Sequence, residues 1–148
     1  MPMRIGAALP PLDGAVEWLN GPQPAIQGDR APVVIHFWAL SCSACKANMP
    51  DVQALRDKYT VSGVRFIAVH TRRSPGDKEL KEVRRIAEEI GITEPCALDD
   101  AGAIGNRFEL SGMWPYYFLF DHDGRMKRRG AGGIGLRLLK CALAEIVG

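Results

Sequence analysis

Two cysteines separated by two residues are the strongest chemical signal in this sequence. Cys42 and Cys45 enclose Ser43 and Ala44, and the motif follows an apolar run that ends in FWAL. Two thiols at this spacing can cycle between a dithiol and a disulfide, or they can supply half of a site for zinc or another soft metal. The spacing alone leaves both interpretations open, so the surrounding sequence has to decide between them.

The motif falls between a predicted strand and a predicted helix. Residues 33–40 form a continuous apolar run, typical of a central strand buried on both faces, and residues 43–59 carry apolar side chains at helical spacing. A thiolate at Cys42 would meet the free N–H groups and positive dipole end of that helix, with a small contribution from Lys46, so its pKa should fall below about 8.5. We therefore expect Cys42 to attack and Cys45, one turn inside the helix, to resolve the mixed disulfide.

The remaining elements alternate between strands and helices, which is typical of an α/β protein with a largely parallel sheet. After the motif the sequence predicts a strand at 63–70, a helix capped by Ser74-Pro75-Gly76-Asp77 and ended by Gly91, a strand at 95–98, a helix at 102–108, a hairpin of 116–120 with 125–129, and a closing amphipathic helix over 136–147. We expect a central mixed β-sheet flanked by helices on both faces.

Composition limits the classes of function. The 148 residues are 47% hydrophobic and 24% charged, and we expect residues 1–148 to form one domain. With 19 basic and 17 acidic side chains, the charge is too balanced for a protein whose main task is to bind nucleic acid or a membrane surface. No run approaches the roughly 18 apolar residues of a spanning helix, and the first residues lack the apolar core of a signal peptide. The sequence therefore predicts a cytoplasmic protein, where cysteines are usually kept reduced.

A second motif, Trp114-Pro115 before the strand sequence YYFLF, narrows the choice of chemistry. The chain resembles the thioredoxin superfamily, most closely thiol-disulfide oxidoreductases of the TlpA/ResA group and, within it, the cytosolic YkuV-type proteins. The resemblance covers nearly the whole chain, through the segments EWLNG, VVIHFWALSCSACKANMP, FIAVH and PYYFLFDHDG. It implies a thioredoxin-like fold with an N-terminal extension, Cys42 as nucleophile, Cys45 as resolving thiol, and Pro115 as a cis-proline facing the disulfide.

Several positions depart from the superfamily pattern. Ser43-Ala44 replaces the Gly-Pro of thioredoxins, which leaves the redox potential open within roughly −270 to −120 mV. Trp114 stands where the superfamily has a smaller residue before the proline. Its ring either forms an aromatic wall for substrate or shields the disulfide. His36 stands where thioredoxins carry a buried acid, either to take the proton of Cys45 or as a hydrogen-bonded core residue. Trp38 is expected to pack beneath the motif rather than to contact substrate.

The leading hypothesis is a thiol-disulfide oxidoreductase that reduces or exchanges protein disulfides. It needs no bound cofactor or metal, since the redox-active disulfide takes electrons from an external reductase or thiol pool, and we expect a monomer. Cys96, in the short strand PCAL, is expected to be a small buried hydrophobic residue, and Cys141, off the main apolar stripe of the last helix, to be partly exposed. A disulfide between them is an alternative that the cytosolic context disfavours.

Two other functions stay open. The Cys42-Cys45 pair could bind Cu(I), with His70 or His122 as an added ligand, although His70 is otherwise expected to be a solvated strand end. The chain could also be a thioredoxin-fold adaptor with a vestigial motif.

Overall fold

One mixed six-stranded sheet organises the protein, of which the computed structural model describes residues 3–72, 74 and 79–147. The strand order is β1-β4-β3-β2-β5-β6, with β2, β3 and β4 parallel and the pairs β1–β4, β2–β5 and β5–β6 antiparallel. The elements in chain order are β1 (Glu17–Leu19), β2 (Val33–Trp38), α1 (Ser43–Thr60), β3 (Arg65–Thr71), α2 (Leu80–Glu89), β4 (Cys96–Asp99), α3 (Ala103–Arg107), β5 (Tyr116–Phe120), β6 (Met126–Ala131) and α4 (Gly132–Val147). The predicted mixed sheet is confirmed.

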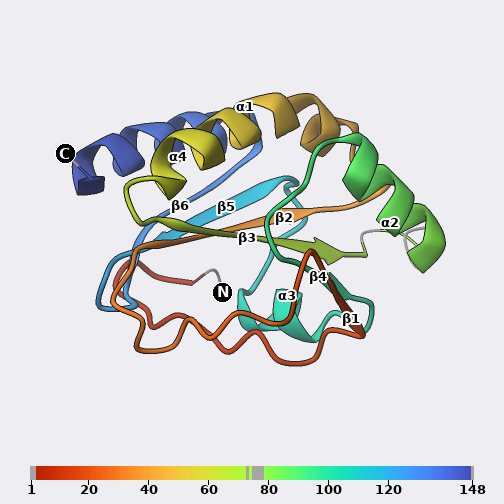
Figure 1. Cartoon of the computed structure of the whole chain (residues 1–148), viewed down its shortest axis with the longest axis horizontal. Helices are drawn as coiled ribbons and strands as arrows, with labels where there is room; N and C mark the ends of the chain where they lie inside the picture. The colour runs from red at the N-terminus through yellow and green to blue at the C-terminus, as the bar shows by residue number, and fades with distance from the viewer. Residues whose placement is uncertain (1–2, 73, 75–78, 148) are drawn as a thin grey trace.

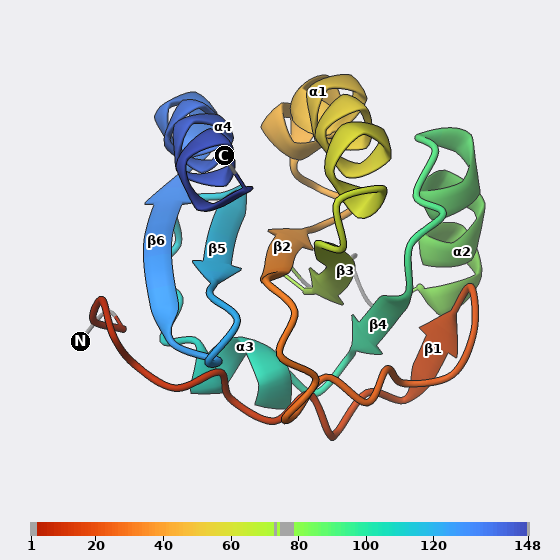
Figure 2. The same ribbon diagram turned by 60° about the vertical axis from the view of Figure 1, so that its left-hand side comes forward.

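Helices cover both faces of this sheet. Helices α1, α2 and α4 lie on one face, while α3 and the N-terminal segment lie on the other (Figures 1 and 2). The central strand β2 feeds both cores, because successive side chains of a strand point to opposite faces. Val34 and Trp38 belong to the core under α1, and Ile35 and Phe37 belong to the core on the α3 side. All six residues of β2 are buried, as its continuous apolar sequence indicates.

The N-terminal segment touches the sheet at both of its edges. Glu17–Leu19 form the short strand β1 beside β4, and Ala8 makes an isolated antiparallel bridge with Arg125. In the sequence between these two contacts, Leu9 and Leu12 bury their side chains in the core on the α3 side. The segment thus completes that core, and its strand β1 was not among the predicted elements.

Two predicted helix boundaries differ from the structure. Helix α2 begins at Leu80 with Glu79 as its N-cap, so Ser74 does not cap it, while Pro75, Gly76 and Asp77 lie outside the described residues. The helix therefore begins where its apolar stripe begins, because packing contributes more to helix stability than a local cap does. Helix α4 begins at Gly132, four residues earlier than the apolar spacing indicated.

Close contact between β6 and α4 explains the early start of α4. A Cβ atom on Gly130 would lie 2.6 Å from the Cα of Gly135, which leaves no room for a side chain at either position. The Gly132 N–H donates to the Pro115 carbonyl at 2.8 Å, so α4 begins directly beside the predicted cis-proline. Glycines at this crossing let α4 approach the sheet closely.

Candidate active site

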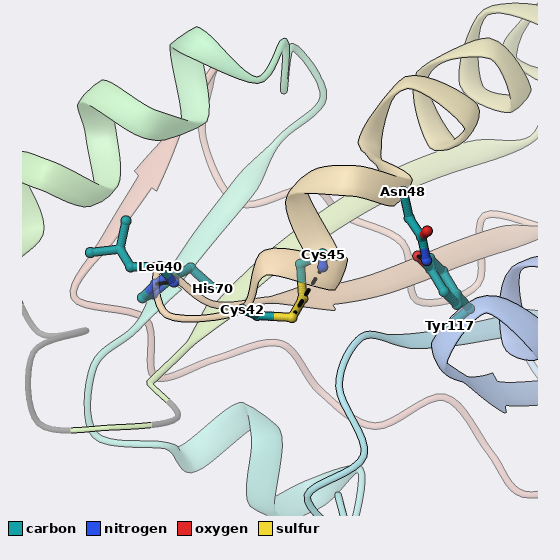
Figure 3. Close-up of a disulfide and its surroundings, with 6 residues drawn as sticks. All are labelled: Leu40, Cys42, Cys45, Asn48, His70 and Tyr117. Carbon is teal, nitrogen blue, oxygen red and sulfur yellow. Dashed lines mark hydrogen bonds between the residues drawn. A yellow bond between two sulfur atoms is a disulfide. The ribbon is translucent and has the colours of Figure 1, made fainter.

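The two motif cysteines form a disulfide at the amino end of α1. Cys42 is the N-cap residue, in an extended conformation, and Cys45 lies within the first turn, with the two Cα atoms 5.3 Å apart. The Cys45 N–H donates to Cys42 Sγ at 3.1 Å (Figure 3). A helix N-terminus leaves N–H groups without intrahelical partners, and here one of them is directed at the sulfur that we expect to become a thiolate.

The sulfur-bearing residues are buried, whereas the dipeptide between them is exposed. Cys42 and Cys45 are each 1% exposed, while Ser43 and Ala44 lie on the surface and Lys46 is half-buried. Cys42 is the expected attacking thiol and Cys45 lies one turn inside the helix, but in the disulfide form both are covered. An outside thiolate therefore needs a local opening around Cys42 before it can attack.

Trp38 and His70 pack together next to the motif. Trp38 is fully buried in the core cluster that contains both cysteines, which agrees with its predicted place beneath the motif. The His70 ring meets the Trp38 ring edge to face, with centroids 4.7 Å apart, and its Nε2 accepts the Leu40 N–H at 3.2 Å. His70 is 2% exposed, so the expectation of a solvated strand end was wrong: its ring packs against Trp38 and bonds to the Leu40 backbone.

The Trp114-Pro115 peptide bond is cis, and hydrogen bonds fix the loop that precedes it. The Tyr116 hydroxyl accepts the N–H groups of Ser111 and Met113, each at 2.7 Å. Trp114 is half-buried, packs against both cores and meets the Tyr116 ring edge to face at 5.3 Å. A pocket of about 480 Å³ lies beside Trp114 and reaches Thr71 at the end of β3. Trp114 thus forms part of a wall, in a position between the core and an open pocket.

His36 is held by a hydrogen bond to a buried carboxylate that the sequence did not reveal. Its Nε2 lies 2.6 Å from Glu94 Oε2, and Glu94 Oε1 accepts from Arg56 at 2.8 Å. His36 and Glu94 are 1% and 6% exposed, whereas the partly exposed Arg56 lies in the C-terminal half of α1. This arrangement favours the alternative of a hydrogen-bonded core histidine, because the Nε2 atom is bonded to a carboxylate.

The partners of Glu94 outweigh the effect of its burial. Burial raises the pKa of this carboxyl. Four effects oppose burial and lower the pKa to about 2: the hydrogen bond to His36, the charge of His36, a backbone hydrogen bond and the hydrogen bond from Arg56. Glu94 is therefore ionised across the range in which proteins normally function. One sequence signal could have pointed to it, an acid two residues before the buried strand in TEPCAL.

Two further groups near the motif titrate far from neutrality. Tyr117, which is paired with His36 in the sheet, accepts a 3.3 Å hydrogen bond from Asn48 Nδ2 on α1 (Figure 3), and burial raises its pKa to about 12. Burial likewise raises the pKa of the Cys96 thiol to about 12, so this cysteine, buried as expected, stays protonated at neutral pH. The other free cysteine, Cys141, is exposed.

The ligands of the copper hypothesis are not brought together. His122 follows β5, whose last residue Phe120 pairs with Val33 at the start of β2, whereas Cys42 follows the end of β2. His122 therefore lies at the opposite end of the sheet from the motif. The Nε2 of His70 already accepts the Leu40 N–H. Over residues 3–72, 74 and 79–147, no cluster of three or more metal-ligating side chains is found.

Comparison with known proteins identifies the family. The model of the AhpC/TSA family matches residues 24–129. The chain belongs to the AhpC/TSA family. Within it, the chain is similar to the thiol-disulfide oxidoreductase YkuV of Bacillus subtilis, with 36% identity over 140 residues that cover 93% of each chain. It is also 31% identical over 114 residues to the thiol-disulfide oxidoreductase ResA of Oceanobacillus iheyensis, covering 77% of this chain and 56% of that relative.

A solved structure supports the thioredoxin-like fold. The solution structure of a thioredoxin-like protein in the oxidized form is 33% identical and superposes with a TM-score of 0.84, covering 98% of this chain and 97% of that one. These likenesses confirm the predicted thioredoxin-like fold and an oxidoreductase role for this family member. In the described part of the chain, no helix has both the length and the apolar character needed to cross a bilayer.

Proposed function

We propose that the protein reduces disulfide bonds in other proteins through the Cys42-Cys45 pair. The observation that carries this proposal is the Cys42-Cys45 disulfide at the amino end of α1, with an N–H of the helix directed at Cys42 Sγ. A sulfur at this place is stabilised as a thiolate, and the thiolate is the form that attacks a disulfide. The similarity to named thiol-disulfide oxidoreductases supports the same chemistry.

The reaction takes two exchange steps. The Cys42 thiolate attacks one sulfur of the substrate disulfide, so that a Cys42–substrate bond forms and the other substrate sulfur leaves as a thiolate. Cys45, after losing its proton, then attacks Cys42 Sγ, which closes the disulfide and releases the second substrate thiolate. Two electrons pass from the cysteine pair to the substrate. An external reductase or thiol pool returns two electrons to the Cys42-Cys45 disulfide.

The residues around the pair receive supporting roles in this proposal. Pro115 and Trp114 line the approach to the motif, and the backbone of Trp114 offers hydrogen bonds to an extended substrate segment. Trp114 acts as an aromatic wall for that segment, in keeping with its half-buried position beside a pocket. Proton transfer from Cys45 to His36 stays a prediction: if His36 only supports the core, a variant that keeps the fold will resolve mixed disulfides at the normal rate.

The proposal places the protein in the reducing cytosol as a monomer. The exposed free thiol of Cys141 supports this placement, because an unpaired surface cysteine is readily oxidised outside reducing compartments. The redox potential tests the direction of electron flow. A value below about −250 mV in dithiothreitol or glutathione buffers fits a reductant, whereas a value above about −180 mV would instead indicate an oxidant or isomerase.

Reduction of insulin by dithiothreitol tests the mechanism with matched variants. We expect Cys42→Ser to lower the rate to that of dithiothreitol alone, and Cys45→Ser to accumulate a covalent mixed disulfide with substrate. Cys141→Ser is the control, because it removes a thiol on the exposed side of α4 and should leave the rate unchanged. Full activity of Cys42→Ser would exclude the mechanism. Metal retained at one equivalent by the purified protein and lost in Cys42→Ser would favour copper binding instead.

A further inference from the structure

His70 is a buried histidine that the exchange reaction above does not use. It lies near the end of β3, pairs in the sheet with Trp38, and is 2% exposed. Its ring packs edge to face against the Trp38 ring with centroids 4.7 Å apart. The imidazole therefore lies where the chain leaves β2 and turns toward Cys42 (Figure 3).

The hydrogen bond that His70 accepts restricts its protonation state. The Leu40 N–H donates to Nε2 at 3.2 Å. An imidazole nitrogen accepts a hydrogen bond only when it carries no proton, so this contact requires the neutral form with the proton on Nδ1. Leu40 is half-buried, and a backbone N–H that is removed from water needs such a partner.

Leu40 belongs to the short link that carries the nucleophile. Residues 39–42 join β2 to α1, and within them the Cys42 N–H donates to the Ala39 carbonyl at 3.1 Å. At the end of the link, Cys42 Sγ accepts the Cys45 N–H at 3.1 Å. The bond from Leu40 to His70 ties this link to β3. The position of Cys42 Sγ relative to the helix N–H groups therefore depends on the Leu40–His70 hydrogen bond.

We propose that His70 is a positioning residue for Cys42: its neutral imidazole holds Leu40 and thereby fixes Cys42 at the amino end of α1. This inference rests on the proposed function, which makes Cys42 the attacking thiol. His70 acts through the chain link and does not touch the substrate. A ring that merely filled space could be replaced by another ring without any effect on the reactivity of Cys42.

Two substitutions separate these roles of His70. His70→Phe keeps an aromatic ring against Trp38 but removes the acceptor, whereas His70→Gln keeps an acceptor oxygen at about the distance of Nε2 from the backbone. Both are made in a Cys141→Ser background, because Cys141 is an exposed thiol that would also be alkylated. The rate at which iodoacetamide alkylates Cys42 in the reduced protein is measured against pH, with the modified site identified by mass spectrometry.

We expect His70→Phe to move the midpoint of the alkylation profile up by about half to one pH unit, because the thiolate loses part of its stabilisation by the helix N-terminus. His70→Gln should stay close to the reference profile. The proposal is overturned if the His70→Phe profile coincides with the reference, or if both variants shift equally while their unfolding midpoints remain those of the reference.

A second measurement needs no substitution. Long-range proton–nitrogen correlation spectra of the oxidised protein should show His70 protonated at Nδ1 and unprotonated at Nε2. A proton on Nε2 would overturn the proposal even if His70→Phe failed to fold. Failure of the wild-type chain to reduce insulin would count against the proposed function alone, because the tautomer and the alkylation profile report on His70 without any protein substrate.

Discussion

At the scale of single residues, Glu94 links two buried or partly buried partners and should contribute strongly to stability. Its carboxylate forms hydrogen bonds with both the buried His36 and Arg56. Glu94→Gln removes the negative charge from these two contacts. We expect a loss of about 2–4 kcal/mol in the free energy of unfolding at pH 7, measured by urea denaturation. The matched control is Glu17→Gln, because Glu17 forms an exposed ion pair with Arg84 and should cost less than about 0.5 kcal/mol. Equal losses in the two variants would contradict the role given to Glu94.

The contribution of Glu94 also has a defined pH dependence. Its pKa is about 2 in the folded protein against an ordinary value of 4.5, so the folded state binds the proton more weakly than the unfolded state does. The resulting stabilisation, on the order of 3 kcal/mol, is complete above the unfolded pKa and is lost as the pH falls toward the folded one. The difference between wild type and Glu94→Gln should therefore shrink by roughly half between pH 6 and pH 3. A difference that stays constant over this range would place the folded pKa of Glu94 near its ordinary value.

Sequence reasoning found the residues whose signals are local and missed those defined by distant contacts. Cys42, Cys45 and the cis-proline Pro115 belong to short motifs that can be recognised in isolation. Glu94 could not be placed, because its partners lie 58 and 38 residues away along the chain. His70 was misplaced for a similar reason, since its burial depends on a link that belongs to a different strand.

At the scale of elements, the crossing of β6 and α4 depends on the absence of two side chains. Gly135→Ala would place a Cβ 2.5 Å from the carbonyl carbon of Gly130, and backbone atoms cannot move aside cheaply. We expect a loss of about 2–3 kcal/mol in the free energy of unfolding, because α4 must shift away from the sheet. A shift of α4 would also disturb the contact between Gly132 and Pro115, so the rate of insulin reduction should fall as well.

Gly133→Ala is the control for this crossing. Gly133 is exposed, is part of α4, and has no neighbouring atom within 4 Å of an added Cβ. Alanine is a better helix former than glycine, so this variant should equal or exceed the wild type in stability by up to about 1 kcal/mol. Thermal or urea unfolding of the two variants side by side separates a packing effect from a general effect of alanine. A destabilised Gly133→Ala, or a neutral Gly135→Ala, would contradict the close approach.

The elements with a clear apolar or turn signal were predicted, and β1 was missed. The strand over residues 116–120 has the predicted bounds, because it is a buried apolar run between clear turn signals. The end of α2 was also predicted, since Gly91 adopts a positive φ directly after the C-cap. Strand β1 has three residues and only half-buried side chains, so its pairing with β4 leaves almost no pattern in the sequence.

At the scale of the whole molecule, the shared sheet predicts one cooperative unfolding unit. The three tryptophans lie in β1, in β2 and before β5, while the helices dominate the far-ultraviolet circular dichroism. If residues 1–148 form one domain, tryptophan fluorescence and circular dichroism should report the same urea midpoint. The measurement is made on the oxidised protein, so that no disulfide is exchanged during unfolding. Two separate transitions would show that the N-terminal segment or another part unfolds on its own.

The N-terminal segment reaches both edges of the sheet, and this has a consequence for biosynthesis. Ala8 and Glu17–Leu19 leave the ribosome early, yet their partners are Arg125 and residues 96–98. The segment stays unpaired until most of these residues have been made, and the apolar side chains of Leu9 and Leu12 stay exposed with it. Because chains grow from the N-terminus, this segment is made before its partners and is among the last parts of these residues to dock. During that interval the nascent chain depends on its own solubility, or on a chaperone, to keep these residues from other partners.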